Sequence, residues 1–142
     1  MSVNTGSAKW SGTLKEGKGH VSTKSGALND QPYGFNTRFE DAPGTNPEEL
    51  IGAAHASCFS MALSMVLGEH DLTADSIETS ADITLEQQAG GFAVTKSHLT
   101  VKARIPDASE ETFMEAAKGA KENCPISKLL DCDITMDAEL VS

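Results

Sequence analysis

The stretch that decides the fold is Asn46-Pro-Glu-Glu-Leu-Ile-Gly-Ala-Ala-His-Ala-Ser-Cys-Phe-Ser-Met-Ala-Leu-Ser-Met-Val-Leu-Gly68. Asn46 suits the N-cap of a helix, Pro47 suits the first helical position, and the two glutamates that follow complement the positive end of the helix dipole. The residues from Leu50 to Gly68 carry no charge, and apolar side chains occur on every side. This pattern predicts a long helix at the centre of the folded protein.

The same helix is long enough to span a bilayer, but its composition argues against that interpretation. It contains a histidine, three serines and two glycines, it has acidic flanks, and it lacks a belt of Trp or Tyr. The chain has a net charge of −10, and its 11 basic residues form no cluster, which disfavours binding to nucleic acid or to an anionic membrane. Residues 1–25 contain no apolar signal-like segment, so we expect a cytoplasmic protein that does not enter a membrane.

The rest of the chain predicts an α+β protein that forms a single domain over residues 1–142, because no linker divides it. The alternation of apolar and polar residues predicts strands over 8–14, 20–23, 33–39, 77–86, 92–105 and 131–140. We expect a second helix after Pro106, with Asp107 and Glu110 as its capping box and its end at Cys124-Pro125.

Cys58 is the first candidate for chemistry, because it lies within the uncharged helix. Only a thiolate is a strong nucleophile, and an apolar setting opposes its formation unless a cation is near. Arg38 is the candidate cation, and the predicted strand places it on the face opposite to the aromatic residues. Free cysteines are also common as small core residues, so a packing role for Cys58 stays open.

The two other cysteines differ in their sequence context. Cys124 lies at a predicted helix end just before a proline, where a side chain can be presented or moved. A second, mobile thiol can capture a sulfenic acid as a disulfide. Cys132 lies on the apolar face of the last predicted strand, and we expect it to be a core residue.

Glu48 is a candidate partner for Arg38, but its spacing from Cys58 limits how it can act. On a straight helix the two residues are about 15 Å apart along the axis, at about 1.5 Å per residue. If both serve one site, either the helix breaks or Glu48 comes from a second subunit. As a first-turn residue, Glu48 could instead merely complement the helix dipole.

The histidines predict no metal centre, and we expect no cofactor. His55 lies one turn before Cys58, so a Cys–His pair stays open, although a hydrogen-bonded structural histidine is the preferred interpretation. The remaining histidines are scattered, and Cys124 and Cys132 show no zinc-binding spacing.

Three stretches closely resemble the OsmC branch of the OsmC/Ohr hydroperoxide reductases: residues 31–40, 44–60 and 123–127. The resemblance implies an intertwined α+β homodimer, with long central helices wrapped by antiparallel sheets and active sites at the subunit interface. It implies that Cys58 attacks the peroxide, that Cys124 resolves the sulfenic acid as a disulfide, and that Arg38 with Glu48 prepares the site. The implied activity is reduction of organic hydroperoxides, and more weakly of hydrogen peroxide, in stress defence, with an external dithiol, such as a lipoyl group, as reductant.

Two other classes of function are compatible with the sequence. The chain could be a non-enzymatic dimeric stress protein that binds a hydrophobic ligand, or a redox sensor. Stoichiometry separates an enzyme from a binder, because an enzyme consumes many peroxides per subunit when a dithiol is present.

Overall fold

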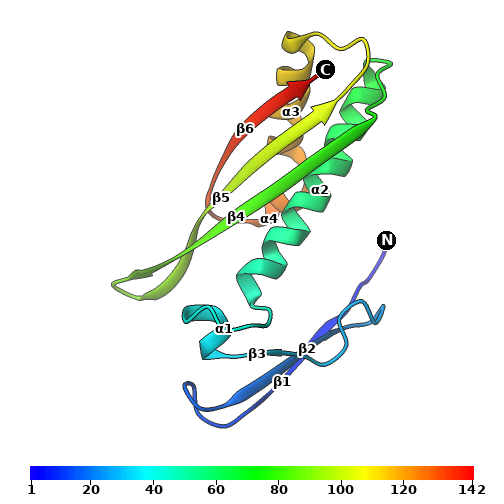
Figure 1. Cartoon of the computed structure of the whole chain (residues 1–142). Helices are drawn as coiled ribbons and strands as arrows, with labels where there is room; N and C mark the ends of the chain where they lie inside the picture. The colour runs from blue at the N-terminus through cyan, green and yellow to red at the C-terminus, as the bar shows by residue number, and fades with distance from the viewer. The chain divides into compact units, whose positions relative to one another are not determined.

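The computed structural model describes all residues from 1 to 142, which divide into two compact units, Met1–Leu50 and Ile51–Ser142 (Figure 1). The boundary falls in the first turns of the long helix. The expectation of a single domain stays a prediction.

The first unit contains a small antiparallel sheet. Strands β1 (Gly6–Ser11), β2 (Lys18–Thr23) and β3 (Gln31–Tyr33) follow one another in the order β1-β2-β3. The first two strands form a hairpin, with Ser11 opposite Lys18 at the turn. Its loop begins at Gly12, whose φ of 99° favours a residue without a side chain.

The expected strand over 33–39 is wrong, because helix α1 (Phe35–Phe39) follows directly after β3. The Thr37 hydroxyl accepts a hydrogen bond from the Gly34 amide at 2.8 Å and donates one to the Gly34 carbonyl at 3.0 Å. The rings of Phe35 and Phe39 pack against each other one helical turn apart in a tilted arrangement, with centroids 4.9 Å apart. Aromatic residues at every second position also fit this i, i+4 contact, so periodicity alone could not separate the two structures.

Helix α2 (Pro47–Glu69) confirms the predicted long helix. The Asn46 side chain caps it by accepting a hydrogen bond from the Glu49 amide at 2.8 Å. By length and composition α2 could cross a membrane, since an 18-residue window has a mean hydropathy of 1.7. A core helix of a soluble protein meets the same criterion, so this is weak support for a membrane span.

The second unit contains a mixed sheet. Strands β4 (Ser76–Gln88) and β5 (Gly91–Arg104) form a long antiparallel hairpin, and β6 (Asp133–Val141) pairs with β5 in parallel. The three predicted strands of this region are confirmed. A parallel pair needs a crossover connection, which helices α3 (Glu110–Asn123) and α4 (Pro125–Leu129) provide here. The sequence pattern does not predict α4.

The start of α3 differs from the expectation. Its N-cap is Ser109, whose hydroxyl accepts a hydrogen bond from the Thr112 amide at 3.1 Å. The expected capping box of Asp107 and Glu110 is therefore wrong. Asp107 instead has a φ of 67°, a left-handed conformation that fits a turn before the helix.

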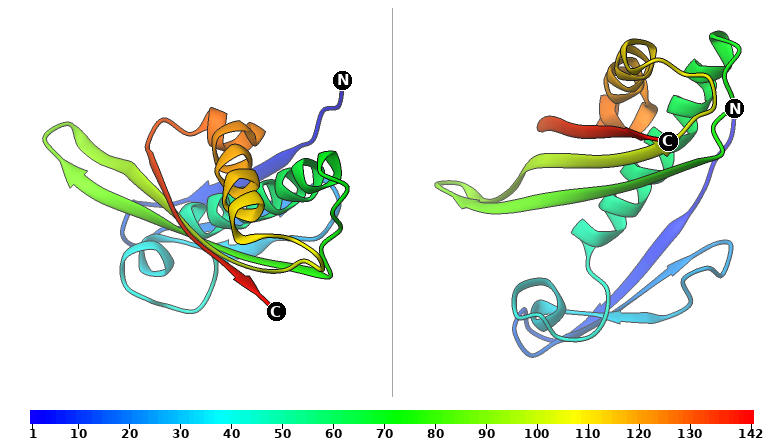
Figure 2. Two further views of the ribbon diagram at one scale, coloured as in Figure 1. Left: turned by 90° about the horizontal axis from the view of Figure 1, so that it is seen from above. Right: turned by 45° about the horizontal axis from the view of Figure 1, so that its top comes forward.

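The core of the second unit lies between its sheet and two helices. Figure 2 shows α2 and α3 on one face of the β4-β5-β6 sheet. Gly52 lets α2 approach β4 closely, because a Cβ built there would lie only 2.8 Å from the Ala81 carbonyl oxygen. The most deeply buried apolar side chains are Phe59, Leu63, Leu67, Leu99, Val101, Ala103, Phe113, Ala116, Ala117, Ala120 and Cys124.

Candidate active site

Two of the three free cysteines meet where α2 passes the α3–α4 junction. Cys58 is partly buried in the middle of α2, and the Cys124 thiol lies close enough to it to raise its pKa. Cys124 is 1% exposed. Both residues belong to the second unit, so the fold brings together two thiols that are far apart in the sequence.

The surroundings of Cys58 oppose its ionisation. Burial raises the pKa of the Cys58 thiol, a hydrogen bond with the backbone of Ile126 lowers it, and the neighbouring Cys124 raises it again. No cation contributes to this balance. A reactive thiolate at Cys58 therefore needs a positive group from elsewhere.

Cys124 has an unusual position in the backbone, because it ends α3 and begins α4. Its amide donates to the Ala120 carbonyl at 3.0 Å, which closes the last turn of α3. Its sulfur accepts a hydrogen bond from the Ser127 amide at 3.3 Å, which caps α4. Pro125 cannot donate a backbone hydrogen bond to α3, so the chain must turn at this residue.

Arg38 and Glu48, both in the first unit, form a bidentate ion pair. The guanidinium Nε lies 2.8 Å from Oε1, and Nη2 lies 2.9 Å from Oε2. The hydrogen bond with Glu48 raises the pKa of Arg38 above its ordinary value despite partial burial. The pairing that the sequence suggested is present, although Arg38 lies on a helix and not on a strand. Two parallel hydrogen bonds fix the orientation of a guanidinium better than one.

His55 fills the predicted structural role. It is fully buried, and its Nδ1 and Nε2 each lie 2.7 Å from a hydroxyl oxygen, of Ser97 and of Ser127 respectively. It makes no hydrogen bond to Cys58. Sequence reasoning missed both serines as members of the site. Ser127 could have been suspected, since it lies two residues after the Cys124-Pro125 helix end.

Cys132 lies apart from this pair. It precedes β6 and is only partly buried, so its expected place among the core residues of the strand is wrong. Burial raises the pKa of the Cys132 thiol, and the charge of Asp133 raises it further. These conditions do not favour a thiolate.

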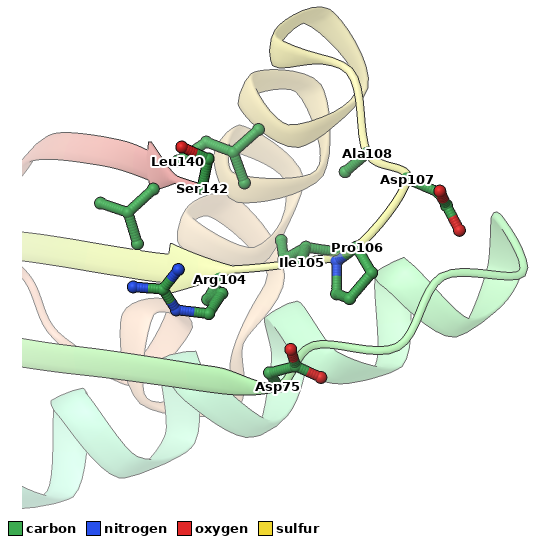
Figure 3. Close-up of a pocket in the computed structure, with 9 residues that line it drawn as sticks. Asp75, Arg104, Ile105, Pro106, Asp107, Ala108, Leu140 and Ser142 are labelled. Carbon is green, nitrogen blue, oxygen red and sulfur yellow. The ribbon is translucent and has the colours of Figure 1, made fainter.

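Two pockets in different units differ in chemistry. In the first unit, a pocket of about 320 Å³ is lined by Trp10, Leu14, Tyr33, Gly34, Phe35, Arg38, Phe39 and Pro47. In the second unit, a pocket of about 450 Å³ lies at the end of β5 and β6, with Asp75, Arg104 and Asp107 among its lining residues (Figure 3). No thiol or imidazole lines the second pocket, and no ion pair joins its charged residues.

Comparison with known proteins gives a consistent result. The model of the OsmC-like protein family matches residues 39–139. The chain is 55% identical to Peroxiredoxin OsmC of Escherichia coli over 96% of both chains. It is 32% identical to the organic hydroperoxide resistance protein OhrB of Bacillus subtilis, over 86% of this chain and 88% of OhrB.

Solved structures show the same fold. The crystal structure of Bacillus subtilis OhrB matches with a TM-score of 0.68 and 28% identity, over 96% of this chain and 98% of that one. An OsmC-like protein of unknown function from Vibrio cholerae matches with a TM-score of 0.76 at 17% identity, over 97% and 99% of the two chains. From the family match and the identity to a full-length relative, we conclude that this chain belongs to the OsmC family.

Proposed function

We propose that this protein is a cysteine-based peroxidase that reduces organic hydroperoxides to alcohols. The observation that carries the proposal is the pair of free thiols, Cys58 and Cys124, which lie beside each other inside the second unit. The names of the relatives, a peroxiredoxin and an organic hydroperoxide resistance protein, support the same activity.

In the proposed reaction the Cys58 thiolate attacks one oxygen of the hydroperoxide. The O–O bond breaks, the alkoxide takes up a proton and leaves as the alcohol, and Cys58 becomes a sulfenic acid. Cys124 then attacks the Cys58 sulfur, the S–O bond breaks, and water leaves as a disulfide forms. An external dithiol reduces the disulfide by thiol–disulfide exchange and is itself oxidised.

The cation that Cys58 needs is, in this proposal, Arg38 of a second subunit, oriented by Glu48. The bidentate pair holds the guanidinium in one orientation. Lowering the pKa of a thiol from about 8.5 by two units requires about 2.7 kcal/mol and makes it mostly ionised at pH 7. The same cation can stabilise charge on the departing alkoxide.

The proposed functional unit is a homodimer. One face of α2 carries small and sulfur-containing residues that are exposed in the single chain: Ala54, Ser57, Met61, Ser64, Met65 and Gly68. Met61 and Met65 are 76% and 65% exposed. These positions recur at helical spacing, and a second α2 packed against this face would remove their apolar surface from water.

The pocket beside Arg38 supports a substrate with an apolar tail. Aromatic and aliphatic side chains form most of its wall, and the guanidinium is its one charged group. A small polar peroxide would leave this apolar surface in contact with water, whereas an alkyl or aryl hydroperoxide would cover it.

The test is steady-state consumption of cumene hydroperoxide with excess dithiothreitol. Wild type is expected to consume many equivalents per subunit, and Cys58→Ser none above background. Cys132→Ser is the matched control, since it removes a thiol outside the pair, and it should remain active. Consumption that stops at about one equivalent in wild type, or equal rates in wild type and Cys58→Ser, would exclude the enzyme.

A further inference from the structure

The second unit contains a buried chain of hydrogen bonds that ends at Cys124. His55 is fully buried, with Ser97 of β5 at Nδ1 and Ser127 of α4 at Nε2, both at 2.7 Å. The Ser127 hydroxyl oxygen lies 3.1 Å from the Cys124 sulfur. Ser97, His55, Ser127 and Cys124 therefore form one continuous line of donors and acceptors.

The direction of the protons in this line follows from the chemistry of the groups. If Nδ1 carries the imidazole proton and donates a hydrogen bond to the Ser97 oxygen, then Nε2 has a free lone pair. Nε2 can then accept the hydroxyl proton of Ser127, whose oxygen can accept the thiol proton of Cys124. In this arrangement a proton has an unbroken path from the sulfur to the imidazole.

The environment of His55 keeps the ring available as a proton acceptor. No carboxylate or cation contacts either ring nitrogen, and the titratable groups near the line are the thiols Cys58, Cys124 and Cys132, the last hydrogen-bonded to the Ser97 backbone. Burial lowers the pKa of His55 below its ordinary value, so the ring is neutral near pH 7.

We propose that Ser127, held by His55, removes the thiol proton of Cys124 in the step that forms the disulfide. The inference rests on the proposed function, in which Cys124 resolves the Cys58 sulfenic acid. Ser127 touches the reacting sulfur and is the catalytic residue of this step, while His55 acts through it as a positioning residue and proton store.

The step balances without an outside reagent. The Cys124 proton moves to the Ser127 oxygen as the hydroxyl proton moves to Nε2 of His55, which leaves a thiolate and an imidazolium. The thiolate forms the S–S bond with Cys58 while the S–O bond of the sulfenic acid breaks. The departing hydroxide takes the proton back from the imidazolium through the same hydroxyl and leaves as water.

The chain offers a matched pair of variants for the test. Ser127→Ala and Ser97→Ala each remove one buried hydroxyl that is hydrogen-bonded to the same imidazole, but only Ser127 contacts Cys124. One equivalent of cumene hydroperoxide is added to the reduced protein without reductant. Oxidation of Cys58 is followed by dimedone trapping of the sulfenic acid, and disulfide formation by mass spectrometry of quenched samples.

We expect Cys58 to be oxidised at the wild-type rate in both variants. Disulfide formation should be about ten- to a hundredfold slower in Ser127→Ala at pH 7, in the range of a lost general base. In Ser97→Ala it should be slowed less than in Ser127→Ala, because Ser97 contacts the imidazole and not the Cys124 sulfur. Ser127→Thr keeps a hydroxyl and should restore most of the rate.

A pH profile separates a proton relay from a packing defect. Without the relay, resolution depends on the spontaneous ionisation of Cys124. The rate in Ser127→Ala should therefore rise with pH and approach wild type in alkaline solution, where hydroxide can remove the thiol proton instead. A packing defect would slow the step equally at every pH. His55→Gln should show the same profile as Ser127→Ala, because glutamine can hydrogen-bond but cannot store the proton.

Each contrary result has a definite meaning. Equal rates of disulfide formation in Ser127→Ala and wild type, equal losses in the two alanine variants, or a loss that is independent of pH would overturn the relay. If a variant does not fold, the wild-type profile still decides, since a relay predicts a flat rate from pH 7 to 8. Failure of wild-type Cys58 to form any sulfenic acid would instead refute the proposed function.

Discussion

One cysteine lies at the α3–α4 junction and another just before β6, yet the two thiols have different surroundings. Cys124 is buried at a helix junction and hydrogen-bonded to the hydroxyl and amide of Ser127. Cys132 is partly buried between Asp131 and Asp133, and the pKa of its thiol is raised by burial and by Asp133. The comparison shows that two thiols of one unit can differ in the hydrogen-bond donors and the charges around the sulfur, which are the conditions that control thiol reactivity.

The largest effect should come from removing each thiol in turn. Cys124→Ser should complete one rapid oxidation and then lose catalytic turnover by more than about a hundredfold, because no second protein thiol captures the sulfenic acid. Cys132→Ser should keep its activity, with any loss traceable to stability. Peroxide consumption with dithiothreitol and the mass of the oxidised protein measure both. Turnover of Cys124→Ser at the wild-type rate would show that Cys124, like Cys132, is not needed for catalysis.

The next effect concerns Arg38, because neither cysteine region provides a cation of its own. Arg38→Ala should raise the pKa of Cys58, because the thiolate loses its cation, and slow peroxide attack about ten- to a hundredfold. Glu48→Ala should act in the same direction but less, and the double variant should be little worse than Arg38→Ala, since the glutamate acts through the arginine. Alkylation rates of Cys58 against pH measure this, with Cys132 as the internal control. Additive losses would mean that another group activates Cys58.

A smaller effect should appear in the acid stability of the second unit. The pKa of His55 is lowered in the folded state, so the unfolded chain binds a proton more readily. Stability should be constant above about pH 6.5 and fall as the pH drops toward the folded pKa, by up to about 1.4 kcal/mol per unit. Denaturation midpoints of wild type and His55→Gln measure this, with exposed His70→Gln as control. An equal acid slope in wild type and His55→Gln would contradict it.

The smallest expected effect tests the charge around Cys132. Asp133→Asn removes a neighbouring negative charge and should lower the pKa of the Cys132 thiol. Its iodoacetamide alkylation at pH 7 should rise about two- to threefold. Asp137→Asn, the same change farther along β6, should leave the rate unchanged. Equal rates in both variants would mean that burial alone controls Cys132.

The parts of the fold that the sequence predicted best are those with long, regular patterns. The cap at Asn46, the run of α2 and the alternation along β4, β5 and β6 each involve many residues that favour the same structure. The prediction of a strand over 33–39 was wrong because a short aromatic repeat suits a strand and a helix equally. The predicted capping residue of α3 was wrong because Asp107 and Ser109 both suit an N-cap. The left-handed conformation of Asp107 fits a turn, and Ser109 caps the helix.

The site was predictable only where one residue type implies a chemistry. Cys58, Cys124, Arg38 and Glu48 could be proposed from their types and their sequence context. Ser97 could not, because a serine on the inner face of a strand has no signal until the strand register places it against His55. The parallel pairing of β5 with β6 was also invisible, since strand alternation does not encode direction.

One residue, Cys124, closes α3 with its amide and opens α4 with its sulfur. Movement of that sulfur toward Cys58 as a bond forms would weaken the hydrogen bond that it accepts from the Ser127 amide, so the oxidation state of the thiol would change the backbone order of α4. In the reduced protein the Ser127 amide should be shielded from solvent deuterium, and in the oxidised protein it should exchange faster. A reductant that attacks the disulfide would then approach Cys124 at the end of α4 where the backbone is less ordered.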